Sequence, residues 1–261
     1  VMIGMGARLQ VFQNASICDI TAQDEFDLSR PGREKCAFFC ISSDQDSTFD
    51  FLSSLFFSFL FIKLVRYADT EGVDGKLPIG VNFVLDEFPN LGVINDFKKK
   101  ISTVRSRNIG ISVIFQNIAQ LKNRYPNDEY LEILGNCDTQ IALGCTDEVT
   151  ARFISNRTGE VTIDVNSQSK QLYAMRMTDY TPEYRETNSV GRRKLMTADE
   201  VLRMPLDEAL IILRGQNVFK VRKFDYTRHP ESRKLKKCKA AAYIPDCRKE
   251  KEDYSIVQSV E

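Results

Sequence analysis

The stretch VNFVLDEFPNLG, residues 81–92, decides how the fold is interpreted. Its first five residues are mainly apolar, which predicts a fully buried strand. Asp86 and Glu87 follow directly. Two carboxylates at the carboxyl end of a buried strand are costly unless a cation or a chemical task holds them there. Because ligands bind at that edge in open α/β sheets, the stretch predicts a ligand site around the two acids.

A strand that ends in Asp-Glu is the pattern of a Walker B segment. In that interpretation Asp86 would hold Mg²⁺, directly or through water. Glu87 would orient and deprotonate an attacking water molecule. The alternative is a loop that merely begins with acidic residues, since short runs of this kind arise by chance.

A second stretch supports the first. The apolar run ISVIF, 111–115, predicts another buried strand, and Gln116 stands at its carboxyl end. If the two strands are neighbours, Gln116 lies beside Asp86 and Glu87. An amide there can bond both a terminal phosphate and the water that attacks it. Taken alone, Gln116 could equally be a surface or helix-capping amide.

The rest of the chain alternates between strand and helix patterns. This alternation predicts an α/β fold with a mainly parallel sheet and helices on both faces. A Ser/Thr-rich segment, 160–187, is expected to be a hairpin or an excursion, and Thr197 is expected to cap a short helix. Further strands are expected at 36–42, 139–144, 209–215 and 217–224, and helices at 94–107, 118–125 and 148–156.

Overall charge says little about partners, because 36 basic residues balance 36 acidic ones. Any basic surface must be local, such as Lys98–Lys100 or the basic segment 228–251; either could contact DNA phosphates, but a solvated face is the simpler interpretation. The seven cysteines are scattered, which argues against a disulfide framework or a zinc site and suits a reducing cytoplasm. Cys40, Cys137 and Cys145 are expected to be small buried hydrophobic residues.

The most apolar run, 49–65, contains Asp50 and Lys63. Its uninterrupted part is shorter than a membrane span requires, so we expect a core helix that is covered nearly all round. The chain begins without an initiator Met, as expected for a fragment of a longer protein.

The two stretches together carry a family resemblance. VNFVLDEFPNLG followed by STVRSRNIGISVIFQNIAQLKNRYP, 102–126, closely resembles the type IV coupling proteins, which are TraG/TraD-like DNA-transfer ATPases. LGNCDTQIALG, 134–144, and LRGQNVFKVRKFDYTRHP, 213–230, are similar to the same family. The resemblance extends over about residues 25–230.

The resemblance implies the second half of a RecA-like P-loop motor domain that binds ATP and Mg²⁺ between the subunits of a homo-hexamer. Such motors pass relaxase-bound single-stranded DNA into a type IV secretion channel from the cytoplasmic face of the membrane. It makes Asp86 and Glu87 the Walker B acids and Gln116 the sensor of the terminal phosphate. Arg105 matches the arginine that reaches a neighbouring subunit's nucleotide, with Arg107 as the competing candidate and a helix-end cation as the alternative role.

One departure from the family pattern is large. The phosphate-binding motif GxxxxGK[ST] has no match, since residues 4–8 read GMGAR. The resemblance therefore implies the tail of an inserted helical domain at 1–27, the Walker B half of the motor at 28–228, and a basic, flexible tail at 229–261. We expect this chain alone to bind ATP poorly. Two other functions stay open: a non-catalytic docking or adaptor fragment, or another RecA-like DNA or pilus motor. His229, the only histidine, is expected to be structural.

Overall fold

The computed structural model describes residues 12, 14–22, 24, 26–42, 50–170 and 184–237. The chain forms two compact units, one of residues 1–30 with 225–261 and one of residues 31–224. In the first unit the described helices are short: α2 (Ala15–Thr21), η6 (Tyr226–Arg228) and η7 (Pro230–Lys234). The predicted boundaries at 27/28 and 228/229 remain predictions.

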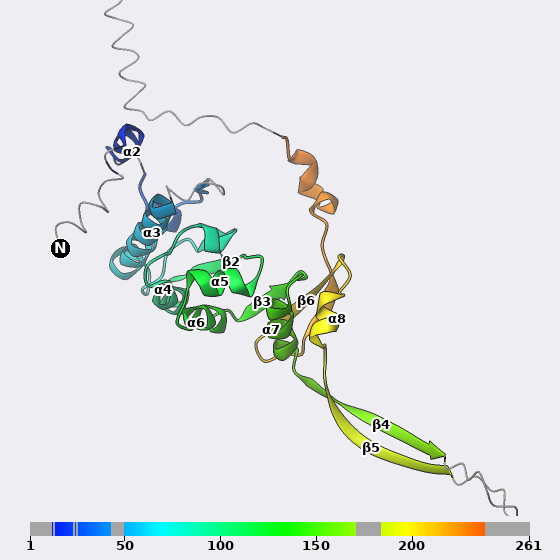
Figure 1. The fold of residues 1–261 in the computed structure, drawn as a ribbon. Coiled ribbons are helices and arrows are strands. Elements are labelled where there is room, and N and C mark those ends of the chain that lie inside the picture. The colour runs from blue at the N-terminus through cyan, green and yellow to red at the C-terminus, as the bar shows by residue number, and fades with distance from the viewer. Residues whose placement is uncertain are drawn as a thin grey trace, which may run out of the picture. The chain divides into compact units, whose positions relative to one another are not determined.

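The second unit holds the alternating strands and helices (Figure 1). Strands and helices do alternate along it, so the α/β class predicted from the sequence is confirmed. Its elements in chain order are α3 (Asp50–Glu71), β1 (Val81–Leu85), η4 (Phe88–Asn90), α4 (Phe97–Thr103), η5 (Val104–Arg107), β2 (Ile109–Val113), α5 (Ile118–Arg124), α6 (Glu129–Gly135), β3 (Thr139–Ala142), α7 (Glu148–Thr158), β4 (Glu160–Lys170), β5 (Tyr184–Lys194), α8 (Ala198–Leu202), β6 (Glu208–Leu213) and β7 (Phe219–Arg222).

β1 and β2 form a parallel pair, with Val81 opposite Ile109 and Leu85 opposite Val113. One face of β1 packs on α3, where the rings of Phe83 and Phe61 stack at 4.2 Å. On the other face Val84 is 68% exposed. The expectation of a fully buried strand was therefore wrong, because only one face of β1 is covered by described residues.

The remaining strands pair differently from the mainly parallel sheet that we expected. β3, β6 and β7 form an antiparallel sheet in that order. β6 and β7 follow each other closely, and the turn between them includes Gly215 at φ 75°; strands joined by so short a turn can pair only in antiparallel fashion. α7 and α8 pack on this sheet through a cluster of Ala151, Ile154, Val201 and Leu210.

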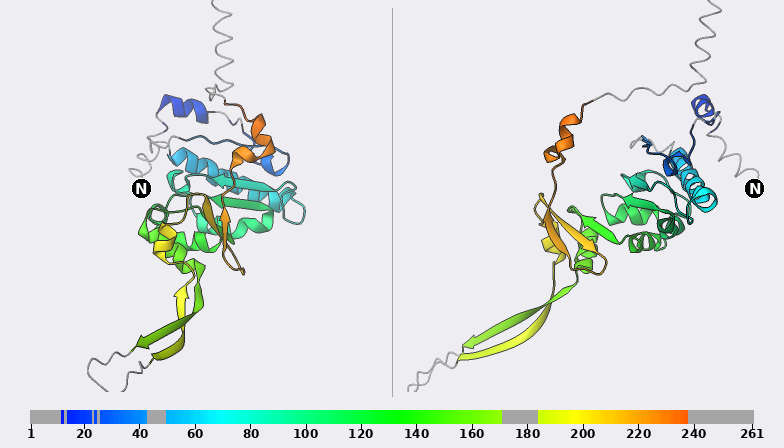
Figure 2. Two further views of the ribbon diagram at one scale, coloured as in Figure 1. Left: turned by 90° about the vertical axis from the view of Figure 1, so that its right-hand side faces the viewer. Right: turned by 180° about the vertical axis from the view of Figure 1, so that it is seen from behind.

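The polar segment that begins at residue 160 forms the expected hairpin. β4 and β5 are 11 residues each and pair along their whole length, from Glu160 opposite Lys194 to Lys170 opposite Tyr184. The pair is a long two-stranded ribbon in each view (Figure 1, Figure 2). Two of its three tyrosines, Tyr173 and Tyr180, lie outside the described residues.

α3 is covered on one face only, which corrects the expectation of a helix buried nearly all round. Phe57 and Leu64 are buried, whereas Leu55, Phe59 and Ile62 are exposed. By length and composition alone this helix could cross a membrane, and it is the one described helix that meets that test. A soluble core helix passes the same test, so the observation decides nothing by itself.

Three local predictions were also wrong. Residues 36–42 form no strand, and Phe39 is 88% exposed, because no described strand pairs with this run. Cys40 is exposed, and Cys137 and Cys145 are only half-buried. The helix expected over 94–107 begins at Phe97 and tightens into a 3-10 turn from Val104.

Candidate functional site

Parallel pairing brings the ends of β1 and β2 to one edge of their sheet. Beyond the last strand pair, Ile114 N donates to Leu85 O at 2.9 Å, and Phe88 N donates to Ile114 O at 2.9 Å. These two backbone bonds fasten the turn that carries Asp86 and Glu87 to the segment that precedes Gln116. The acids and the amide therefore lie together, as the sequence predicts.

Glu87 and Gln116 are in direct contact. Gln116 Nε2 donates to Glu87 Oε1 at 3.1 Å. Glu87 Oε2 is buried and has no hydrogen-bond partner in the described part of the chain. Glu87 also adopts a left-handed backbone conformation, φ 47° and ψ 42°, which is uncommon for a residue other than glycine. Backbone strain of about 1–3 kcal/mol and an unpaired buried acceptor are features that concentrate at functional sites.

Asp86 is the exposed acid of the pair. Its Oδ1 accepts a hydrogen bond from Glu87 N at 3.1 Å, which leaves the outer oxygen facing solvent. No cluster of three or more potential metal ligands occurs among the described residues. Mg²⁺ needs no such cluster, because it is usually held by one or two carboxylates, waters and substrate phosphates. Asp86 fits that limited role.

Asn117, the residue after Gln116, begins the next helix. The Asn117 side chain caps α5 and accepts a hydrogen bond from Gln120 N at 2.9 Å. The capping role that Gln116 could have filled is therefore taken by the next residue. The start of α5 is fixed further by Ile118 N, which donates to Thr150 Oγ1 of α7 at 3.0 Å.

A layer of aromatic rings supports the loop that carries the acids. Phe88 stacks on Tyr125 with ring centroids 5.2 Å apart, and both rings contact Phe97. The Tyr125 hydroxyl accepts a hydrogen bond from Ile94 N at 3.3 Å. Burial raises the pKa of Tyr125 to about 12. The three rings are almost fully buried, so they hold the loop of Asp86 and Glu87 in place.

Arg124 joins the same loop to α3. Its Nε donates to Pro89 O at 2.5 Å, and its Nη2 lies 3.5 Å from Asp50 Oδ2. Gly92 packs against the same turn of α3: a Cβ there would lie 2.7 Å from Asp50 O, and its φ is 81°. Only glycine suits both constraints.

Arg105 lies at the opposite edge of the sheet, before the start of β2. Its Nη1 contacts Asp138 Oδ2 at 2.8 Å, and its side chain is 83% exposed. Arg214, which follows β6, binds the other oxygen of Asp138 at 3.3 Å. Since Gln116 follows the other end of β2, Arg105 and the acids do not converge on one point of this chain.

Arg107 has a different environment. Its Nε donates to Asp69 Oδ1 at 2.9 Å, and its Nη2 contacts Asp69 Oδ2 at 3.4 Å. This paired contact ties η5 to the end of α3. Of the two arginines considered from the sequence, Arg105 is thus the one that projects into solvent.

The other residues singled out from the sequence have local contacts. Lys98 pairs with Glu129 at 3.2 Å, Lys99 lies 3.7 Å from Asp96, and Lys100 donates to Asn95 O. His229 Nδ1 accepts a hydrogen bond from Glu231 N at 3.2 Å at the start of η7, in line with a structural role.

Sequence reasoning missed several residues that build the site, among them Asn117, Arg124, Asp138 and Thr150. Asp138 meets Arg105 although the two residues are 33 positions apart in the chain. Arg124 and Thr150 act through contacts far along the chain and left no local signal.

Comparison with known proteins agrees with the family resemblance seen in the sequence. The model of the family described as "Type IV secretory system Conjugative DNA transfer" matches residues 1–257. Protein VirD4 of Rhizobium rhizogenes is 25% identical over 83% of this chain, and conjugal transfer protein TraG of Escherichia coli is 32% identical over 53%. The chain spans 31% and 22% of the lengths of these two relatives.

A solved structure, "Plasmid coupling protein TrwB in complex with ADP and Mg2+", is similar over 70% of this chain and 40% of its own, with 15% identity and a TM-score of 0.49. The predicted membership in the coupling protein family is confirmed by the family match, whereas the RecA-like class stays a prediction. The chain belongs to the type IV secretory system conjugative DNA transfer family.

Proposed function

We propose that this chain is the Walker B part of an ATP-driven DNA translocase that couples relaxase-bound single-stranded DNA to a type IV secretion channel. The complete protein would act as a homo-hexamer at the cytoplasmic face of the membrane, with ATP and Mg²⁺ between subunits. The observation that carries the proposal is the hydrogen bond between Gln116 Nε2 and Glu87 Oε1, 3.1 Å long, at the carboxyl edge of β1 and β2.

Each residue has a role that its surroundings support. Glu87 keeps one carboxylate oxygen on Gln116 and leaves the buried Oε2 without a partner, so Oε2 is the atom that would take a proton from water. The Gln116 amide has a second N–H, which would donate to a phosphate oxygen. The exposed Asp86 would hold Mg²⁺, which neutralises charge on the phosphates when it is bound.

Arg105 would act on a neighbouring subunit rather than on its own site. It lies at the amino edge of β2, whereas Glu87 and Gln116 lie at the carboxyl edge. Among the described residues, Asp138 is the one that pairs with its exposed guanidinium, and at the surface such a pair is weak enough to be exchanged for a phosphate. The position suits an arginine offered across a subunit interface.

The test is Glu87→Gln in the complete, assembled gene product. We expect ATP binding to persist while DNA-stimulated hydrolysis falls at least about 100-fold, because an amide cannot take the proton. Glu186→Gln, on exposed β5, is the matched control and should hydrolyse ATP normally. Wild-type turnover in Glu87→Gln would refute the role of Glu87. A wild-type protein that binds partner proteins but no ATP would favour the adaptor alternative.

A further inference from the structure

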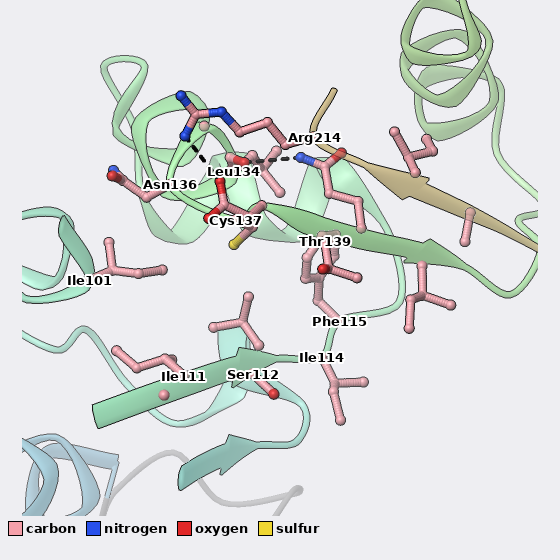
Figure 3. A pocket seen from close by; sticks show the side chains of 18 of the residues that line it. Ile101, Ile111, Ser112, Ile114, Phe115, Leu134, Asn136, Cys137, Thr139 and Arg214 are labelled. Atoms are coloured by element: carbon pink, nitrogen blue, oxygen red, sulfur yellow. Dashed lines mark hydrogen bonds and ion pairs between the residues drawn. The ribbon is translucent and has the colours of Figure 1, made fainter. Parts of the chain in front are cut away.

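Arg214, the residue that follows β6, shares a carboxylate with Arg105. β6 runs antiparallel to β3, so the carboxyl end of β6 lies beside the amino end of β3. There Arg214 Nη1 binds Asp138 Oδ1 at 3.3 Å, while Arg105 Nη1 binds Asp138 Oδ2 at 2.8 Å. Figure 3 shows Arg214 extending over the segment that contains Asn136 and Cys137. Because the two Nη1 atoms bind the two oxygens of one carboxylate, they lie within about 8 Å of each other.

The guanidinium of Arg214 contributes little to holding the chain in place. Arg214 N donates to Asp138 O at 3.0 Å, and the strand pair continues directly from there with Leu213 opposite Thr139. Backbone pairing therefore fixes the position of Asp138 without help from the arginine side chain. That side chain is 81% exposed, and ion pairs between exposed groups stabilise a fold only weakly. The guanidinium is thus available for a ligand.

The second arginine changes the net charge of the cluster. Arg105 and Asp138 alone would form a neutral pair, which attracts a phosphate only weakly. With Arg214 the cluster carries one net positive charge. Among the described residues that line the cavity of about 940 Å³ beside it, these three are the charged ones, so no other lining residue cancels that charge.

A second hollow next to the cluster adds further positive charge. It has a volume of about 500 Å³, and Arg105 lines it together with Lys76 and Arg107. Arg107 is neutralised by Asp69, but Lys76 is exposed. The described residues that line this hollow include no acid. The surface before β2 therefore carries a surplus of positive charge, which suits a polyphosphate better than a neutral partner.

We propose that Arg214 is a second arginine that acts across the subunit interface. Asp138 holds Arg105 and Arg214 side by side, and both bind the phosphate chain of a nucleoside triphosphate at the carboxyl edge of a neighbouring copy. Guanidinium groups suit this task because their paired N–H donors match the oxygens of a phosphate. The inference rests on the proposed function and deepens it, since it adds a cation to the site that Arg105 serves.

Arg214→Ala in the complete, assembled gene product is the first test. We expect the kcat of ATP hydrolysis, measured without DNA, to fall at least about 10-fold, because a group that stabilises charge in the transition state is lost. Tm should not change. Arg203→Ala is the matched control: this arginine of α8 is 74% exposed and pairs with Asp199 of the same helix. It should hydrolyse ATP normally. Wild-type kcat in Arg214→Ala would overturn the proposal.

Mixed assemblies show whether Arg214 acts on its own subunit or on the neighbour. One mixture contains equal amounts of Glu87→Gln and Arg214→Ala subunits. The other contains equal amounts of wild-type subunits and of subunits with both changes. If each site combines Glu87 of one subunit with Arg214 of the next, the two mixtures have equally many intact sites and hydrolyse ATP at similar rates. If Arg214 acts within its own subunit, the first mixture has no intact site, whereas the second keeps about half of them. A much slower first mixture would therefore overturn the proposal.

A double variant separates a direct role from a positioning role. If Arg214 touches the phosphates, Arg214→Ala should lower kcat further in a protein that already carries Asp138→Asn. If Arg214 served only to place Arg105 through Asp138, the second change would add no loss, and the catalytic role would be wrong.

Two more outcomes identify other causes. A loss of hydrolysis that appears only with DNA present, together with weaker DNA binding, would make DNA the anion that Arg214 binds and would overturn the proposal. The proposed function fails separately, through wild-type turnover in Glu87→Gln. An inactive Glu87→Gln beside a fully active Arg214→Ala would remove only the role of Arg214.

Discussion

Gln116 Nε2 donates a hydrogen bond to Glu87 Oε1 across the two ends of a parallel strand pair, 29 residues apart along the chain. Glu87 makes this contact from a left-handed backbone conformation, and Asn117, rather than Gln116, caps the helix that follows.

Replacing Gln116 should reduce catalysis and not folding. Gln116→Leu keeps the size of the side chain but removes both N–H donors, so we expect hydrolysis in the complete assembled protein to fall about 100-fold or more. Gln120→Leu, four residues further on, is the control. Because Gln116 also positions Glu87, the double variant with Glu87→Gln should lose much less than the product of the two single losses. Fully multiplicative effects would contradict a shared role.

The two arginines of η5 should separate into one catalytic and one structural residue. Arg105→Ala removes an exposed side chain, so Tm should be unchanged while hydrolysis by the assembled protein falls about 1,000-fold. Arg107→Ala breaks a paired contact with Asp69 and should cost about 1 kcal/mol of unfolding free energy. An equal loss of activity in isolated monomers of Arg105→Ala would exclude action across an interface.

Tyr125 should make the fold sensitive to alkali. Burial raises its pKa to about 12, above the value of about 10 in an unfolded chain. Its contribution to stability is therefore complete below pH 10 and is lost as the pH rises from 10 to 12, by about 2–3 kcal/mol. The measurement is urea unfolding at several pH values.

Tyr125→Phe provides the comparison for that experiment. It leaves Ile94 N without its acceptor and should cost about 1 kcal/mol at pH 7. The difference between variant and wild type should shrink or reverse by pH 12, because phenylalanine does not titrate. A difference that is constant across this range would show that Tyr125 does not titrate as its burial implies.

Thr150 should contribute more to the stability of the fold than an exposed threonine does. Thr150→Val keeps the shape of the side chain but leaves the buried Ile118 N–H unpaired, so the unfolding free energy should fall by about 1–3 kcal/mol. Thr162→Val, on the exposed ribbon, should change it by less than about 0.5 kcal/mol. Similar effects in the two variants would show that the bond to Ile118 contributes little.

The sequence was most informative where short-range patterns set the structure. The strand before Asp86, the helix cap of Thr197 and the helix that begins at Ile118 were all predicted correctly, since each depends on neighbouring residues. The juxtaposition of Glu87 and Gln116 followed from one assumption, that consecutive strands pair in parallel. The roles assigned to these residues are still predictions.

The failures share one cause, which is that burial depends on distant parts of the chain. Val84 and Ile141 have the composition of core strands, yet they are exposed because no described element covers them. The apolar run around Phe39 was interpreted as a strand for the same reason. α6 was not predicted either; unlike α5, it begins without a side-chain capping bond. None of these facts is encoded locally.

The contacts of Arg124 connect the loop of Glu87 to α3. Its guanidinium contacts both Pro89 O and the Asp50 carboxylate, and Gly92 packs against the backbone of Asp50, so the loop that carries Glu87 is joined to the first turn of α3. α3 is 22 residues long, or about 33 Å, and its far end is tied to η5 through Asp69 and Arg107. One end of α3 thus contacts the loop of Glu87 and the other end contacts η5, which bears Arg105, so a displacement at one end would be transmitted along a single helix to the other.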